Sequence, residues 1–188
     1  MSEQSEIHIH VQSTPNPNAL KFILNKTVKT EGKATYKSPE ECHTNPLARY
    51  IFGLPSVSEV HFFDNVITVT QDGNADWGEL ESKIRAAILE KIAAHDPNFQ
   101  TETEKKKVEP ATPEIAKIEE ILDRTVRPAL QGDGGDLQVV GLEGNVLLVN
   151  YQGACGSCPS STAGTLKAIE SILKDEFKSD IEVQAVNL

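Results

Sequence analysis

The sequence predicts an α+β protein made of two small domains. Strand-like and helical segments follow one another without a fixed repeat, and 38% of the 188 residues are hydrophobic, which is ordinary for a folded chain. A polar stretch over residues 98–112 contains Pro110 and a charged run, and it lacks helical or strand periodicity. We therefore expect an N-terminal domain over residues 1–97, a flexible linker over 98–112 and a C-terminal domain over 113–188. A charged helix over 101–108 is the alternative for the linker.

The N-terminal half carries strand signals followed by a helix signal. The predicted strands are residues 7–11, 20–24, 57–63 and 66–70, the last two joined as a hairpin by Asp64 and Asn65. Asp76 and Glu79 then form a start that resembles a capping box, and apolar residues recur after it at helical spacing. This half is predicted to be a small α+β domain.

The C-terminal half predicts the order α-β-β-α-β. The predicted elements are a helix from Pro113 bounded by Pro128, strands over 137–142 and 146–151, a helix over 159–177 and a strand over 181–186. The glycine-rich stretch from Gln131 to Asp136 is expected to make a tight connection into the first of these strands. Its acidic residues are candidates for a dimer or client surface.

Charge and hydropathy exclude several classes of partner. The formal net charge is -10, so the phosphates of a nucleic acid would be repelled on average. No apolar run approaches the roughly 18 residues that span a bilayer, so we expect no membrane partner. Residues 1–6 show neither a signal peptide nor an Arg-rich transit pattern, and we expect a cytoplasmic protein.

The chemistry is expected at Cys155 and Cys158, two of the three cysteines in the chain. They lie in the segment GACGSCP, on a loop between a predicted strand and a predicted helix. Pro159 suits the first turn of that helix, whose free N–H groups favour anionic sulfur nearby. This helix end contributes about 0.3–1 kcal/mol, which is too little to ionise both thiols at neutral pH. Metal coordination would ionise them.

The spacing alone fits a metal site, a redox disulfide or an incidental pair. Common iron–sulfur clusters need four thiolates, and zinc needs four soft or nitrogen ligands. The C-terminal half offers two cysteines and no histidine, so a second copy of the chain would complete the set in a two-fold dimer. A structural zinc would instead need Cys42, His43, His8 or His10 from the other domain.

Three segments resemble the C-terminal domain of NifU, the Nfu domain: VRPALQGDGGDLQVV, LLVNYQGACGSCPSST and TLKAIE. Residues 7–97 resemble the domain that precedes it in Nfu proteins, through TPNPNALKFIL, PLARYIFGLPSVSEVHFF and DNVITVT. The resemblance implies an iron–sulfur cluster carrier or scaffold that is not an enzyme. It also implies a [4Fe-4S] cluster bound by Cys155 and Cys158 between two subunits and delivered to apo client proteins after loading by an upstream donor. Four cysteines suit [2Fe-2S] as well.

The rival hypothesis is a thiol–disulfide oxidoreductase that uses Cys155 as nucleophile and Cys158 to resolve. The small residues around the two cysteines are expected to leave the site open to attack by client thiols. Cys42 is interpreted as a bystander, with an exposed thiol or a transient ligand as the alternative. His8 and His10 alternate along one strand and are expected on its solvent face. The N-terminal domain is expected to contact clients or partners.

Overall fold

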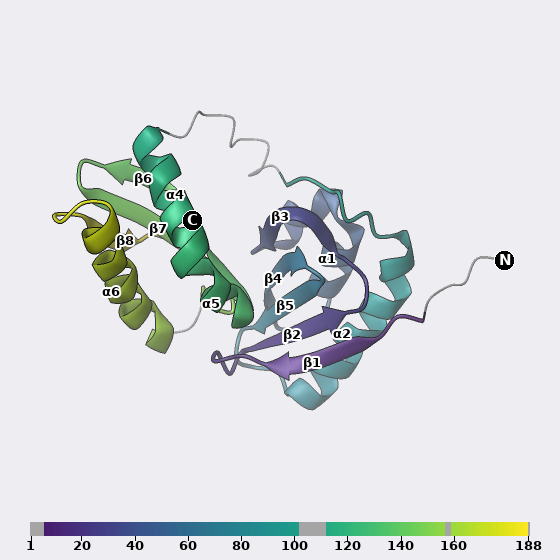
Figure 1. Cartoon of the computed structure of the whole chain (residues 1–188). Coiled ribbons are helices and arrows are strands. Elements are labelled where there is room, and N and C mark those ends of the chain that lie inside the picture. Colours follow the sequence, from purple (N-terminus) through teal and green to yellow (C-terminus); the bar gives the residue numbers. More distant parts are fainter. Residues whose placement is uncertain (1–5, 102–111, 157–158, 188) are drawn as a thin grey trace. The chain divides into compact units, whose positions relative to one another are not determined.

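A computed structural model of the chain describes residues 6–101, 112–156 and 159–187, with the backbone alone at 159–162 (Figure 1). The chain divides into two compact units, Met1–Glu104 and Lys105–Leu188. Each unit contains helices and one sheet, so the predicted α+β class with two small domains is confirmed. No helix among the described residues is long and apolar enough to cross a bilayer.

The N-terminal unit is built on a five-stranded antiparallel sheet in the order β1-β2-β5-β4-β3. The elements are β1 (Ile9–Ser13), β2 (Ala19–Leu24), β3 (Lys29–Tyr36), η1 (Pro39–Thr44), α1 (Pro46–Phe52), β4 (Val57–Asp64), β5 (Val66–Gln71), α2 (Trp77–Lys91) and η2 (Ile92–Ala94). The predicted hairpin of β4 and β5 is confirmed. The carboxylate of Asp76 accepts from the amide of Glu79 at 3.3 Å and caps α2 as expected.

The core of this unit lies between the sheet and the two α-helices. Val60 and Phe62 of β4 are fully buried and alternate along the strand, and Ile51 of α1 and Ile84 and Ile88 of α2 belong to the same core. Figure 1 shows both helices on one side of the sheet. Burying one such side chain contributes about 1.5–3 kcal/mol, so α1 is held by its packing despite having only seven residues.

The stretch predicted as a linker begins later than residue 98. Phe99 is 8% exposed and stacks on Tyr36 with ring centroids 6.4 Å apart. The carbonyl oxygen of Phe99 also accepts a 2.7 Å hydrogen bond from Nζ of Lys29. Residues 98–101 therefore belong to the N-terminal unit. The rest of the predicted linker, with its alternative helix, lies outside the described residues apart from Thr112.

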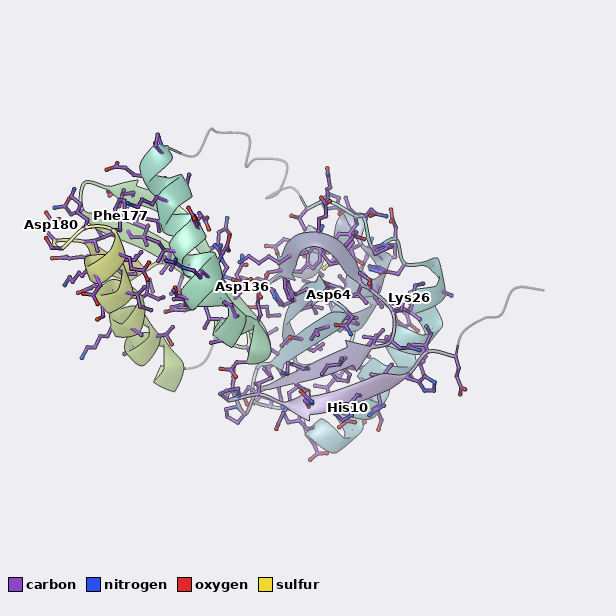
Figure 2. The ribbon with its side chains drawn as sticks, viewed as in Figure 1. His10, Lys26, Asp64, Asp136, Phe177 and Asp180 are labelled. Carbon is purple, nitrogen blue, oxygen red and sulfur yellow. The ribbon has the colours of Figure 1, made fainter. Side chains whose placement is uncertain are left out.

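The C-terminal unit has a three-stranded sheet in the order β6-β7-β8. Its elements are α4 (Pro113–Thr125), α5 (Arg127–Gly132), β6 (Gly135–Glu143), β7 (Val146–Gly153), α6 (Pro159–Glu176) and β8 (Glu182–Ala185). β6 and β7 form the predicted antiparallel hairpin, while β7 and β8 pair in parallel after the crossover through α6. Thr112 caps α4, and Phe177 and Asp180 lie between α6 and β8 (Figure 2).

One helix of the C-terminal unit, α5, was not expected. Pro128 does not simply end the preceding helix, because α5 begins one residue before it and the proline occupies the first turn, where no N–H partner is needed. Ile118 and Leu122 of α4 and Ile169 and Leu173 of α6 are fully buried in one core with the sheet. The predicted loop between β7 and α6 includes residues 157 and 158, which lie outside the described residues, so its CxxC geometry stays a prediction.

Candidate functional site

Cys155 lies at the corner that follows β7. The strand ends at Gly153, whose φ of +65° is in the left-handed region that favours glycine. The amide of Ala154 donates to the carbonyl oxygen of Gly134 at 3.1 Å, and the amide of Gly156 donates to that of Gly153 at 3.0 Å. The first bond joins the corner to the turn before β6 and the second closes the corner itself, so the backbone is hydrogen-bonded on both sides of Cys155.

The thiol of Cys155 packs against the start of β6. Its side chain is 6% exposed and belongs to the C-terminal core. A Cβ atom built on Gly135 would stand 2.5 Å from Sγ of Cys155 and 2.8 Å from the carbonyl oxygen of Gln152. Gly135 pairs with Gly153 across the two strands, and the sulfur occupies space that the missing side chain of Gly135 leaves free. The expectation of an open site is therefore wrong for Cys155, which is packed inward.

Cys158 lies outside the described residues, so the structure does not place it relative to Cys155. The 18-residue helix α6 begins immediately after it, at Pro159. Unpaired backbone N–H groups and the positive end of the dipole at a helix start favour negative charge, which thiolates and thiolate-bound clusters carry. The donor set of two soft thiols from one chain fits half of an iron–sulfur cluster site. Within the described ranges, no three His, Cys, Asp or Glu side chains gather to hold a metal.

A buried ion pair supports the turn that contacts Cys155. Asp136, labelled in Figure 2, is 1% exposed, and its Oδ1 lies 3.4 Å from Nε of Arg127 as an ion pair that lacks hydrogen-bond geometry. Oδ1 accepts from the amide of Leu137 at 2.6 Å, and Oδ2 accepts from Nε2 of Gln131 at 3.1 Å. Asp136 therefore does not belong to a client surface, because its carboxylate is engaged inside the unit.

Arg127 is a supporting residue that the sequence analysis missed. Burial alone would lower its pKa, but the hydrogen bond to Asp123 and the charges of Glu119 and Asp136 hold that pKa above its usual value. The guanidinium is thus charged at any working pH. The sequence does place an arginine shortly before the glycine- and acid-rich stretch from Gln131 to Asp136, which could have suggested an ion pair. It does not show which of the acidic residues is buried against that arginine.

Tyr151 of β7 carries a buried hydroxyl in the same core that contains Cys155. The side chain is 6% exposed, and its hydroxyl oxygen has no hydrogen-bond partner among the described residues. Burial raises the pKa of Tyr151 above its ordinary value, and the charge of Cys155 raises it further. The phenol is therefore a protonated donor, and the described residues offer it no acceptor.

The remaining cysteine and the histidines do not form a second site in the described residues. Cys42 is fully buried in the N-terminal core, where its Sγ contacts the carbonyl oxygen of Ser38 at 3.4 Å. Burial, followed by the charge of Glu41, raises the pKa of the Cys42 thiol to about 12. The alternative of an exposed thiol is therefore wrong, and the bystander interpretation is supported. His8 and His10 are exposed, as expected from their alternation.

The comparisons with known proteins identify two family domains, one in each unit of the chain. Residues 9–95 match the family described as scaffold protein Nfu/NifU N terminal, and residues 118–184 match the NifU-like domain. A Homo sapiens protein named NFU1 iron-sulfur cluster scaffold homolog, mitochondrial, is 36% identical over 88% of this chain and 66% of its own length. NifU-like protein 4, mitochondrial, of Arabidopsis thaliana is 32% identical over 91% of this chain and 63% of its own length. The chain thus spans a little under two thirds of these relatives.

A solution structure of a NifU-like protein from Saccharomyces cerevisiae is also similar, with 29% identity over 50% of this chain and 85% of that chain and a TM-score of 0.46.

The names of the relatives overturn one expectation. They are called mitochondrial, so the cytoplasmic location expected from residues 1–6 is wrong. That expectation used only the lack of a targeting pattern in those residues, and such a lack is not positive evidence for a compartment. Two findings lead to one assignment. The two family domains follow one another in this order along the chain, and the relatives match the chain across both of them. The chain belongs to the Nfu family, in which an Nfu-type N-terminal domain precedes a NifU-like domain.

Proposed function

We propose that this chain is a carrier for an iron–sulfur cluster, which it binds as cargo and passes to apo client proteins. The main support is the pairing of relatives named as iron–sulfur cluster scaffolds with a CxxC segment at the start of a helix. Cys155 and Cys158 are the proposed ligands, and two copies of the chain would supply the four thiolates that a cluster needs. We propose [4Fe-4S] as the cargo, since the family resemblance implies it, and mitochondria as the compartment.

Transfer would proceed by ligand exchange, in which client thiolates replace the carrier thiolates one at a time. Because Cys155 is buried, its corner has to move before a client thiolate can reach the iron. A cluster held between two subunits gives a route for this movement, because separation of the subunits removes half of the ligands. The N-terminal unit, which lacks a proposed ligand, would contact the client or the upstream donor.

The alternative of a thiol–disulfide oxidoreductase has less support. Reactive cysteines are usually at least partly exposed in electropositive surroundings, whereas the side chain of Cys155 is 6% exposed and packs in an apolar core. This alternative remains an outcome of the experiment, because thiol exchange and cluster binding use the same two sulfurs.

The test is anaerobic reconstitution with iron and sulfide, followed by absorbance, iron and sulfide analysis and size determination on one sample. A brown dimer with about four irons and four sulfides per pair of chains supports the proposal. Cys155→Ser and Cys158→Ser should each abolish stable cluster binding, and Cys42→Ser is the matched control that should retain it. A colourless monomer that reduces disulfides would replace the carrier with the oxidoreductase.

A further inference from the structure

The hydroxyl oxygen of Tyr151 is buried and has no hydrogen-bond partner among the described residues, so it is a candidate for a contact with a bound ligand. Buried polar groups in folded proteins nearly always have a hydrogen-bond partner, and an exception calls for a specific explanation. Tyr151 lies four residues before Cys155, and the two side chains belong to the same core. Unlike a surface tyrosine, it cannot turn to water, because its hydroxyl oxygen is buried.

The strand register places Tyr151 and the Cys155 sulfur on one face of the sheet. Tyr151 faces Leu137 across β6 and β7, and Gly153 faces Gly135 two residues along. Residues two apart on a strand point to the same face. Sγ of Cys155 stands where a side chain of Gly135 would begin, so it lies on that face too, diagonal to Tyr151. Diagonal cross-strand positions are about 7–8 Å apart, within reach of an aromatic side chain.

We propose that the phenol of Tyr151 donates a hydrogen bond to the sulfur of Cys155 when that sulfur is a cluster-bound thiolate, and so strengthens retention of the cargo. A neutral thiol is a weak acceptor, whereas a thiolate attracts a donor strongly. The hydroxyl, which has no partner among the described residues of the unloaded chain, therefore gains one on loading. This inference rests on the proposed function. Tyr151 is a positioning residue, since it acts on the cluster through its ligand.

The hydrogen bond should be visible in the redox properties of the cluster. Hydrogen bonds to the sulfurs of an iron–sulfur cluster help to set its reduction potential, because they stabilise the more negative, reduced state. Two copies of Tyr151 would act on one bridged cluster. Tyr151→Phe removes both donors and keeps the rings that pack in the core.

The experiment compares wild type, Tyr151→Phe and Tyr50→Phe after identical anaerobic reconstitution of the full chain. Tyr50 is a matched control because it belongs to the other unit and its hydroxyl already donates to Glu90 at 2.8 Å. We expect Tyr151→Phe to lose its cluster to a chelator at least about fivefold faster and to have a more negative reduction potential. The thermal midpoint of the unloaded variant should not fall, because the removed hydroxyl has no hydrogen-bond partner in the part of the chain that the structure describes.

A second variant separates hydrogen bonding from packing. Replacement of Tyr151 by 3-fluorotyrosine makes the phenol more acidic and a stronger donor, so the reduction potential should move in the positive direction. If wild type takes up a cluster and both variants match it in the rate of cluster loss and in reduction potential, the proposed role of Tyr151 is wrong and the carrier function is unaffected. Failure of wild type itself to take up a cluster would overturn the proposed function and this inference together.

Discussion

The sulfur of Cys155 packs directly against Gly135. A Cβ atom at position 135 would stand only 2.5 Å from that sulfur. Real Cβ atoms do not approach sulfur so closely, and the amide nitrogen of Cys155 would be only 2.9 Å away. The neighbouring backbone cannot rotate aside as a flexible side chain would. Glycine at 135 is thus required by the position of the cysteine.

Gly135→Ala should therefore displace the Cys155 corner. Overpacking of this kind costs about 1–3 kcal/mol, and we expect the free energy of unfolding of the C-terminal unit to fall by that amount. Cluster content after reconstitution should fall with it. The measurements are denaturant unfolding and iron analysis on the same preparation.

Gly141→Ala is the matched control for this change. It lies on the same strand, and a Cβ there would meet no atom within 4 Å. Stability should stay the same or rise by up to about 1 kcal/mol, because alanine restricts the unfolded chain more than glycine does. Equal effects at 135 and 141 would contradict the specific contact with Cys155.

Arg127→Ala should destabilise the C-terminal unit strongly. The change leaves the carboxylate of Asp136 buried without its cation, and breaking a buried pair from one side costs about 3–5 kcal/mol. Arg124→Ala is the control, since Arg124 is 64% exposed and its pair with Glu176 should contribute no more than about 1 kcal/mol. Urea unfolding of the two variants measures the difference.

If the cost of Arg127→Ala comes from the unpaired carboxylate, a second change should recover part of it. Asp136→Asn added to Arg127→Ala removes the buried charge and should regain stability relative to Arg127→Ala alone. A double variant that is no more stable than Arg127→Ala would show that Arg127 acts through its contacts with Glu119 and Asp123 instead.

The elements that the sequence predicted are those with a strong local signal. Alternating apolar residues marked β4 and β5, and the cap at Asp76 marked the start of α2. β3 was missed because its sequence, KTEGKATY, is mostly polar. The strand lies at the edge of the sheet, and several of its side chains are exposed. α1 was missed because two turns are too short to show helical periodicity.

For the candidate site, the sequence indicated the cysteines and the helix after them, and the structure added what holds Cys155. Both Gly135 and Arg127 act through contacts with residues far along the chain, across a strand pairing or across a turn. No local pattern encodes such contacts. The inward packing of Cys155 could not be predicted for the same reason, because small neighbouring residues are compatible with an open loop and with a close approach.

The N-terminal unit should lose stability in mild acid because of His95. Burial lowers the pKa of His95, although its 2.7 Å contact with the carbonyl oxygen of Val28 and the charge of Asp96 oppose the shift, and Lys26 adds to it. The folded unit thus prefers the neutral ring, whereas the unfolded chain binds a proton near pH 6.5. Stability should be fully present above about pH 6.5 and should fall as the pH drops below it.

Trp77 is the single tryptophan and lies in the N-terminal unit, so its fluorescence reports on that unit alone. Denaturant midpoints measured from pH 8 to pH 5 should decrease for wild type and should decrease less for His95→Gln. His10→Gln is the control, because His10 is exposed, and it should follow wild type. An unchanged slope in His95→Gln would assign the acid sensitivity to other groups.

Cys42 should be chemically silent in the folded protein. Its thiol is fully buried, and a pKa of about 12 leaves almost none of it as the reactive thiolate at pH 8. We expect mass spectrometry after brief treatment with iodoacetamide at pH 8 to find Cys42 unmodified in native protein and fully modified in denaturant. Cys155→Ser/Cys158→Ser provides the simplest sample, since Cys42 is then the sole cysteine. Rapid modification of Cys42 in the native double variant would mean that the N-terminal core opens readily. Cys42 would then have to be considered again as a candidate ligand.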